Sequence, residues 1–157
     1  MSSTLNPRHR LTQALGLVLD LVKTYGDVPP EYAIHLTNLF YDGANAALRA
    51  SRDGRGEVTP DQAQRIMTEV VLVCEPANGR PPRISEPYPG TIARAALDRF
   101  GTLEVDWKQK HSLEELTVFY IGAWSFMRAL MGHGTTVNPT HLRMLTEEVS
   151  SRLRVRR

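Results

Sequence analysis

The side chains that could carry out chemistry in this 157-residue chain are scattered along its length. Its five histidines are His9, His35, His111, His133 and His141. No two of them are three or four residues apart, and the chain has only one cysteine. A local zinc site needs closely spaced histidines or cysteine pairs. The sequence therefore predicts no metal site, and we expect no cofactor.

The single cysteine, Cys74, ends the aliphatic run that begins at Val70. Aliphatic neighbours raise the pKa of a thiol and leave it unreactive. One thiol also cannot form an internal disulfide, which suits a reducing compartment. We interpret Cys74 as a buried structural residue and expect a cytoplasmic protein.

A turn that begins near Ser51 superficially looks like the calcium loop of an EF-hand, with Asp53 at its third position and Gly56 at its sixth. However, Ser51 replaces the first carboxylate, Arg55 places a cation among the ligands, and Gln62 replaces the bidentate glutamate. Such a loop does not hold a hard divalent ion. We interpret the segment as a turn that leads into a helix.

Patterns that carry enzyme chemistry are also missing from the sequence. It contains no Gly-x-Ser-x-Gly nucleophile turn and no glycine-rich phosphate loop. The acidic pairs at 114–115 and 147–148 lie near predicted helix starts, where carboxylates complement the helix dipole. We predict that the protein is not an enzyme. A dispersed active site would require a pocket that joins His35, His111 or His133 to carboxylates.

Four helix starts are marked by capping residues, which are Asn6, Thr59, Ser112 and Asn138. Three of them precede a proline, which loses nothing at the first helical position because its missing N–H would lack a helical partner. After Thr59 and Ser112, a Gln or Glu three residues on can bond back to the amide of the capping residue. These caps and the apolar periodicity predict six helices, at residues 7–25, 30–51, 60–74, 91–100, 113–131 and 139–153.

Two of these helices carry features that predict how they pack. Gly43 lies on the apolar face of the second helix, where it permits close approach of another helix. The helix at 113–131 is apolar over most of its circumference, which predicts a central position. Val118 and Ile121 lie on its opposite side, facing either a second layer of helices or a subunit contact. For residues 70–74 a short buried strand is the alternative to helix.

Residues 75–90 form a proline-rich arm that contains five of the ten prolines of the chain. Prolines favour extended polyproline II geometry, and loops of this length are often functional or disordered. We expect an ordered arm on the surface that contacts a partner protein. Its candidate binding residues are Arg80, Arg83, Ile84 and Tyr88.

Positive charge comes from 16 arginines against 3 lysines, although the net charge is only +2. Such a bias is typical of a high-GC bacterial or phage genome, and arginine also suits phosphate or carboxylate contacts. The C-terminal tail, residues 152–157, is basic. If it binds nucleic acid, the contacting residues are Arg152, Arg154, Arg156 and Arg157.

The sequence as a whole predicts an all-α fold: one domain of about six helices spanning residues 1–157, with a central hydrophobic helix and a long proline-rich loop. Its 41% apolar content is ordinary for a globular protein, and no apolar run reaches the roughly 18 residues of a membrane span. We expect a non-enzymatic interaction protein, such as an assembly subunit, inhibitor, immunity or adaptor protein. The alternative is a nucleic-acid-binding protein. The sequence leaves homodimer formation open.

Overall fold

The computed structural model describes residues 6–24, 27–74, 92, 94, 95, 110–132 and 136–155. Within these residues the chain forms five helices, and its only extended pairing is an isolated bridge between Arg52 and Val58. The helices are α1 (Pro7–Lys23), α2 (Pro30–Ser51), α3 (Pro60–Cys74), α5 (Lys110–Met131) and α6 (Pro139–Val155). The predicted all-α class is confirmed.

The asparagine caps form as predicted. The Asn6 side chain accepts a hydrogen bond of 2.9 Å from the Arg8 amide. At the start of α6 the Asn138 side chain accepts bonds from the amides of Thr140, at 2.9 Å, and His141, at 3.2 Å. Each bond satisfies an amide that has no partner inside its own helix, so local sequence sets these two helix starts.

The cap of α3 also forms, but its second bond differs from the prediction. Thr59 Oγ1 accepts from the Gln62 amide at 3.2 Å. The Gln62 side chain does not reach back to the capping residue. Its Nε2 donates instead to the carbonyl of Ala50, at 3.1 Å, in the last turn of α2. Carbonyls at a helix end lack helical partners, so this bond satisfies one of them and fastens α3 to α2.

The turn before α3 is built on Asp53, as the sequence predicts. Its carboxylate accepts hydrogen bonds from the amides of Arg55, at 2.8 Å, and Glu57, at 3.1 Å. Gly56 adopts a φ of +85°, which a glycine takes without steric cost. The carboxylate thus stabilises the turn itself.

Three helix ends differ from the prediction by a few residues. α5 begins at Lys110, so the predicted cap Ser112 lies inside its first turn. α1 ends at Lys23, two residues early, and α6 continues to Val155. The strand alternative for residues 70–74 is wrong, because α3 runs to Cys74. Gly132 ends α5 in the left-handed conformation, with a φ of +60°.

The predicted helix at 91–100 lies largely outside the described residues. Ile92, Arg94 and Ala95 have helical backbone. Ile92 is fully buried, and its amide donates to the Glu69 carboxylate of α3 at 2.7 Å. This bond fastens residue 92 to α3.

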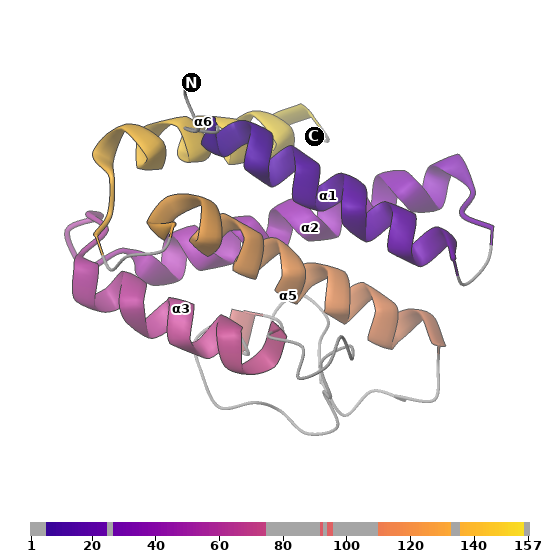
Figure 1. Ribbon diagram of the computed structural model, residues 1–157, viewed down its shortest axis with the longest axis horizontal. Helices are drawn as coiled ribbons and strands as arrows, with labels where there is room; N and C mark the ends of the chain where they lie inside the picture. Colours follow the sequence, from indigo (N-terminus) through magenta and orange to yellow (C-terminus); the bar gives the residue numbers. More distant parts are fainter. Residues whose placement is uncertain are drawn as a thin grey trace.

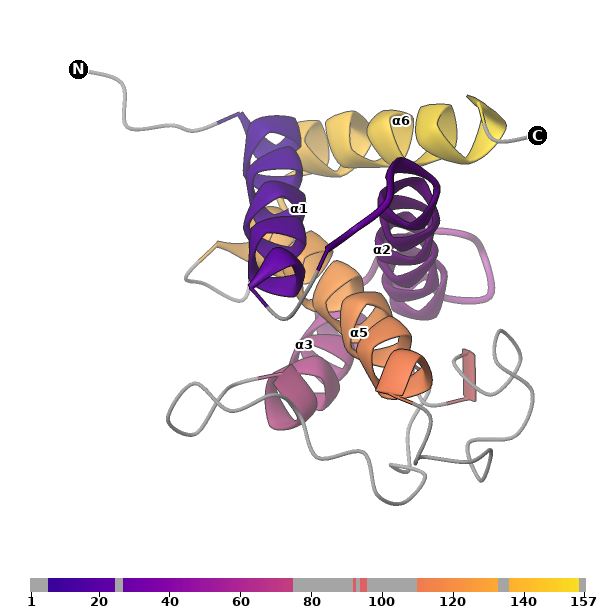
Figure 2. The ribbon, with the colours of Figure 1, turned by 90° about the vertical axis from the view of Figure 1, so that its right-hand side faces the viewer.

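α5 occupies the centre of the described helices and contacts all four of the others (Figures 1 and 2). α2 has its most extensive packing against α5, while α3 and α6 lie on opposite sides of it in both views. α6 also packs against α1 and α2. Such a position requires apolar side chains around most of a helix, which is the pattern that residues 113–131 show.

Glycines on both helices allow the close packing of α2 against α5. A Cβ atom on Gly43 would overlap the backbone carbonyl of Phe119, and a Cβ on Gly122 would overlap the backbone carbonyl of Phe40. The two helix backbones therefore touch directly at this crossing. The prediction that Gly43 permits close helix approach is confirmed, and Gly122 is its counterpart on α5.

The second apolar side of α5 is covered within the chain itself. Val118 is 1% exposed and belongs to the main core, while Ile121 is partly buried and packs against that core. Both α1 and α3 contact α5 in addition to α2. Of the two alternatives that the sequence left open, a second layer of helices is therefore the correct one for Val118. The largest fully buried side chains include Tyr41, Tyr120, Phe40, Phe119 and Phe126.

Candidate functional site

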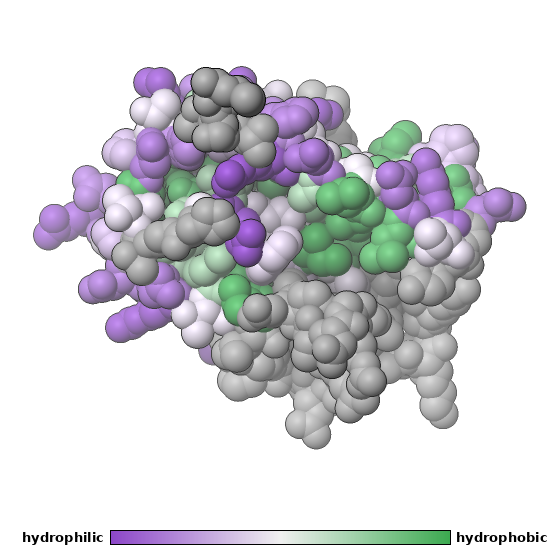
Figure 3. Space-filling model, viewed as in Figure 1, coloured by the Kyte–Doolittle hydropathy of each residue, from purple (hydrophilic) through white to green (hydrophobic). Residues whose placement is uncertain are grey.

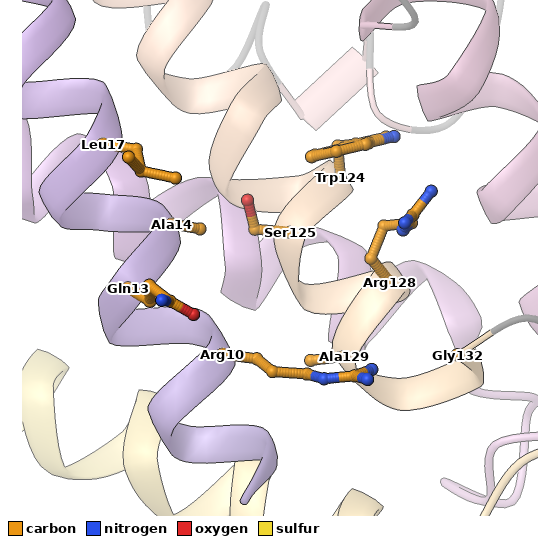
Figure 4. A pocket seen from close by; sticks show the side chains of 9 residues that line it. All are labelled: Arg10, Gln13, Ala14, Leu17, Trp124, Ser125, Arg128, Ala129 and Gly132. Carbon is orange, nitrogen blue, oxygen red and sulfur yellow. The ribbon is translucent and has the colours of Figure 1, made fainter. Parts of the chain in front are cut away.

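A cavity of about 350 Å³ opens between α1 and α5 (Figure 4). We call it the α1–α5 pocket. The residues of α1 that line the pocket are spaced three or four positions apart, so their side chains share one face of the helix. The lining residues of α5 have the same spacing, and Gly132, which directly follows α5, continues it. The lining residues are Arg10, Gln13, Ala14, Leu17, Trp124, Ser125, Arg128, Ala129 and Gly132.

Two guanidinium groups give the pocket its charge. Arg10 comes from α1 and Arg128 from α5, and no carboxylate is among the described residues that line the cavity. Arginine stays protonated at every accessible pH and presents several N–H donors in a planar fork. The pocket is therefore suited to an anionic group, and carboxylate and phosphate are the anions whose geometry matches that fork.

Trp124 positions one of these guanidinium groups. The Arg128 guanidinium carbon lies 5.2 Å from the centre of the Trp124 ring, one helical turn away on α5. The ring face attracts the cation and limits its motion. Figure 4 shows both side chains on the same side of α5, while Arg10 extends across from α1 towards Ala129. The pocket thus combines an aromatic surface with positive charge.

Ser125 contributes a buried hydroxyl group to the wall of the pocket. The residue is 5% exposed, and its hydroxyl oxygen forms no hydrogen bond within the described part of the chain. Figure 4 shows the hydroxyl directed from α5 into the space beside Ala14 and Leu17 of α1. A buried hydroxyl without a partner costs free energy in the folded state.

We expect the substitution Ser125→Ala to raise the free energy of unfolding by about 1 kcal/mol, because it removes an unsatisfied buried hydroxyl and introduces a better helix former. Urea unfolding of the variant and the native protein measures the difference. Thr117→Ala, a substitution of a partly buried hydroxyl residue on the same helix that has an interaction partner, serves as a control and should not stabilise. A destabilised Ser125→Ala variant would show that the hydroxyl is satisfied.

Two exposed leucines on α1 extend the apolar surface of the pocket along the helix. Leu17 lines the cavity and is 67% exposed, and Leu21 follows one turn later and is 53% exposed. Figure 3 shows apolar side chains gathered on the face of the molecule where α1 and α5 lie. A third large apolar residue, Ile34 of α2, is also exposed but lines no cavity described here. The two leucines and the pocket form a continuous apolar and basic surface.

A second hollow, of about 490 Å³, lies at the turn between α1 and α2. It is lined by Lys23, Asp27, Val28 and Pro29. Its two charges have opposite signs, and only Val28 among its lining residues is partly buried. Despite its larger volume, this hollow offers less specific chemistry than the α1–α5 pocket.

The residues that the sequence predicted for partner binding, Arg80, Arg83, Ile84 and Tyr88, lie outside the described residues. Of the residues predicted to bind nucleic acid, Arg156, Arg157 and the side chain of Arg154 also lie outside the described part of the chain.

Arg152, the remaining member of that predicted set, is engaged within the fold. Its Nε donates to Glu148 at 3.1 Å, and its guanidinium lies 5.5 Å from the centre of the Tyr41 ring. Another basic residue, Arg8, pairs with Glu147 and donates to the Met144 carbonyl at 3.2 Å. These arginines hold α6 against α1 and α2, and much of their charge is neutralised by carboxylates.

One predicted histidine does meet a carboxylate. His35 Nε2 of α2 lies 3.4 Å from Glu115 Oε1 of α5, with the Tyr32 ring 6.0 Å from the imidazole. Neither His35 nor Glu115 lines either cavity described here. The structure therefore joins a histidine to a carboxylate outside both of these cavities. His111 and His133 carry no described side chain.

The α1–α5 pocket was not predicted from the sequence. Its two halves lie more than a hundred residues apart, and periodicity does not indicate which helix faces contact one another. One signal was present in the sequence of α1. Leu17 and Leu21 lie one turn apart, and both fall outside the apolar stripe that contains Leu11, Val18 and Val22.

Comparisons with protein-family models, with curated proteins and with solved structures find no match to this chain. None of the helices in the described part of the chain combines the length and the hydropathy of a membrane span. The same residues contain no cluster of three or more histidine, cysteine or acidic side chains arranged to hold a metal ion. The candidate function therefore depends on the chemistry of the α1–α5 pocket and the surface beside it.

Proposed function

We propose that the protein is a non-enzymatic interaction module that binds a segment of a partner protein along the α1–α5 pocket and the two leucines beside it. In this proposal it acts in the cytoplasm as one helical domain. The observation that carries the proposal is the exposure of Leu17 and Leu21, at 67% and 53%, next to a cavity lined by Trp124. Apolar surface next to a cavity is typical of a protein-binding site.

The residue types also match those that dominate binding energy at protein interfaces. Tryptophan and arginine are enriched among the few residues that contribute most. Burying the two leucines would contribute roughly 1.5–3 kcal/mol each. Association itself costs at least about 4 kcal/mol. The leucines alone would give weak binding, so Trp124 and the arginines have to contribute for a stable complex to form.

Site-specific photo-cross-linking in the native host tests this proposal. A photoreactive residue at position 17 should capture one partner protein, whereas the same residue at Gln64, on the exposed face of α3, should not. The captured protein is then purified and its affinity measured. The double variant Leu17→Ser, Leu21→Ser should bind it at least about thirtyfold more weakly, because two buried leucines are lost from the interface.

The matched control is Ile34→Ser, which removes an equally exposed apolar side chain away from the pocket. It should leave the affinity unchanged. All three serine substitutions are at exposed positions, so unfolding in urea should show nearly native stability. Equal cross-linking from positions 17 and 64, or full affinity in the double variant, would rule out this surface as the binding site.

A further inference from the structure

We propose that the bound segment is an acidic amphipathic helix of the partner protein. This inference rests on the function proposed above and adds the chemistry of the partner. Its first basis is charge, because both ionisable groups of the pocket, Arg10 and Arg128, are positive and no described carboxylate lines it. A basic partner would be repelled there. An uncharged one would leave two guanidinium groups without hydrogen-bond acceptors.

The layout of the surface also indicates what the segment presents. Arg10 lies at one end of the pocket and Leu17 at the other, and Leu21 continues the same face of α1. At a rise of about 1.5 Å per residue, the distance from Arg10 to Leu21 along α1 is roughly 16 Å. A helix of about three turns covers that length. Its carboxylates would lie at the Arg10 end and its apolar residues over the leucines.

The shape of the site favours a helix over an extended segment. The pocket lies between the side chains of two helices, which is the geometry of helix-in-groove recognition. An extended segment is usually bound by addition to the edge of a sheet, and the described residues contain no sheet.

The arginines are prepared for carboxylate binding in different ways. Arg128 is held against the Trp124 ring, so it loses less freedom when it binds a partner. Neither Arg10 nor Arg128 forms an ion pair among the described residues, in contrast to Arg8 and Arg152. Their hydrogen-bond donors are therefore available. Phosphates of nucleic acid would also suit the arginines, but they would leave Trp124 and the leucines without apolar partners.

The experiment is a display selection on the full chain with a library of 15-residue amphipathic helical peptides. The apolar positions of the library are fixed, and its polar positions are randomised among Glu, Gln and Lys. Peptides that also bind the Leu17→Ser, Leu21→Ser variant are removed. We expect the enriched peptides to carry glutamates at one end. Changing those glutamates to glutamine should weaken binding at least tenfold, and affinity should fall as salt concentration rises.

The arginine variants provide the second arm. Arg10→Gln combined with Arg128→Gln should weaken binding of the selected peptide at least tenfold. Arg65→Gln with Arg143→Gln, two exposed arginines on α3 and α6, should leave it unchanged. Because none of these four side chains forms a described ion pair, unfolding in urea should show that both double variants are folded.

The outcomes separate this inference from the proposed function. Enriched peptides that are neutral or basic, yet depend on Leu17 and Leu21, would overturn the acidic partner and support the docking surface. If no peptide binds the native protein better than it binds the Leu17→Ser, Leu21→Ser variant, the helical partner is overturned. The cross-linking experiment tests the proposed function independently of this selection. Binding of a 20-base-pair DNA duplex is the third outcome to measure. If the protein binds the duplex more tightly than the peptides, and the Arg10→Gln, Arg128→Gln variant no longer binds it, the acidic helical partner is also overturned.

Discussion

Replacing Gly122 with alanine is expected to lower the free energy of unfolding by about 3 kcal/mol. The added Cβ would overlap the backbone carbonyl of Phe40, and backbone cannot turn aside as a flexible side chain can. α2 and α5 would have to separate along their whole contact, the most extensive in the described structure. Alanine favours helix over glycine by about 1 kcal/mol, which offsets only part of this cost. Urea unfolding measures the difference.

The control for this prediction is Gly16→Ala in α1. Gly16 is an exposed helical glycine, and a Cβ placed on it meets no atom within 4 Å. Alanine there should raise the free energy of unfolding by about 0.5–1 kcal/mol, the opposite sign. Gly43→Ala, at the same crossing, should destabilise as Gly122→Ala does. If Gly122→Ala were as stable as the native protein, the helices could not cross at these glycines.

Raising the pH from 8 to 11.5 is expected to destabilise the native protein by about 2 kcal/mol more than a Tyr41→Phe variant. Burial raises the pKa of the Tyr41 phenol from 10 to about 12, and the nearby Glu148 carboxylate adds to the rise. Tyr41 is 1% exposed, and its hydroxyl donates to Glu148 at 3.3 Å. An ionised phenolate would be buried beside a second negative charge, although Arg152 partly offsets this effect.

The sign of the effect follows from proton binding. Between pH 10 and 12 the phenol ionises in the unfolded chain but stays protonated in the folded protein, so unfolding releases a proton. This stability is fully present below pH 10 and is lost as the pH rises towards 12. Urea unfolding between pH 8 and 11.5, for the native protein and Tyr41→Phe, isolates the contribution of this one side chain. Parallel profiles for the two proteins would show that the pKa of Tyr41 is not raised.

The sequence alone determined where most helices lie, because the signals involved are local. Asn6, Thr59 and Asn138 each cap a helix through amides two or three residues away, so neighbouring residues suffice to predict the start. The Asp53 turn depends on bonds within five residues. Apolar periodicity likewise showed that residues 113–131 form a helix with apolar side chains on most faces, and hence a central one.

Only the tertiary structure decided how these helices meet. The Gln62 side chain bonds Ala50 in the preceding helix, in place of its own cap, because the end of α2 lies close to it in space. Val118 is buried because other helices pack against several sides of α5. The periodicity of a single helix does not reveal such packing. The α1–α5 pocket joins Arg10 to Arg128, whose separation along the chain is far longer than any helical repeat. Local hydrogen bonds fix each helix, whereas packing between distant helices creates the site.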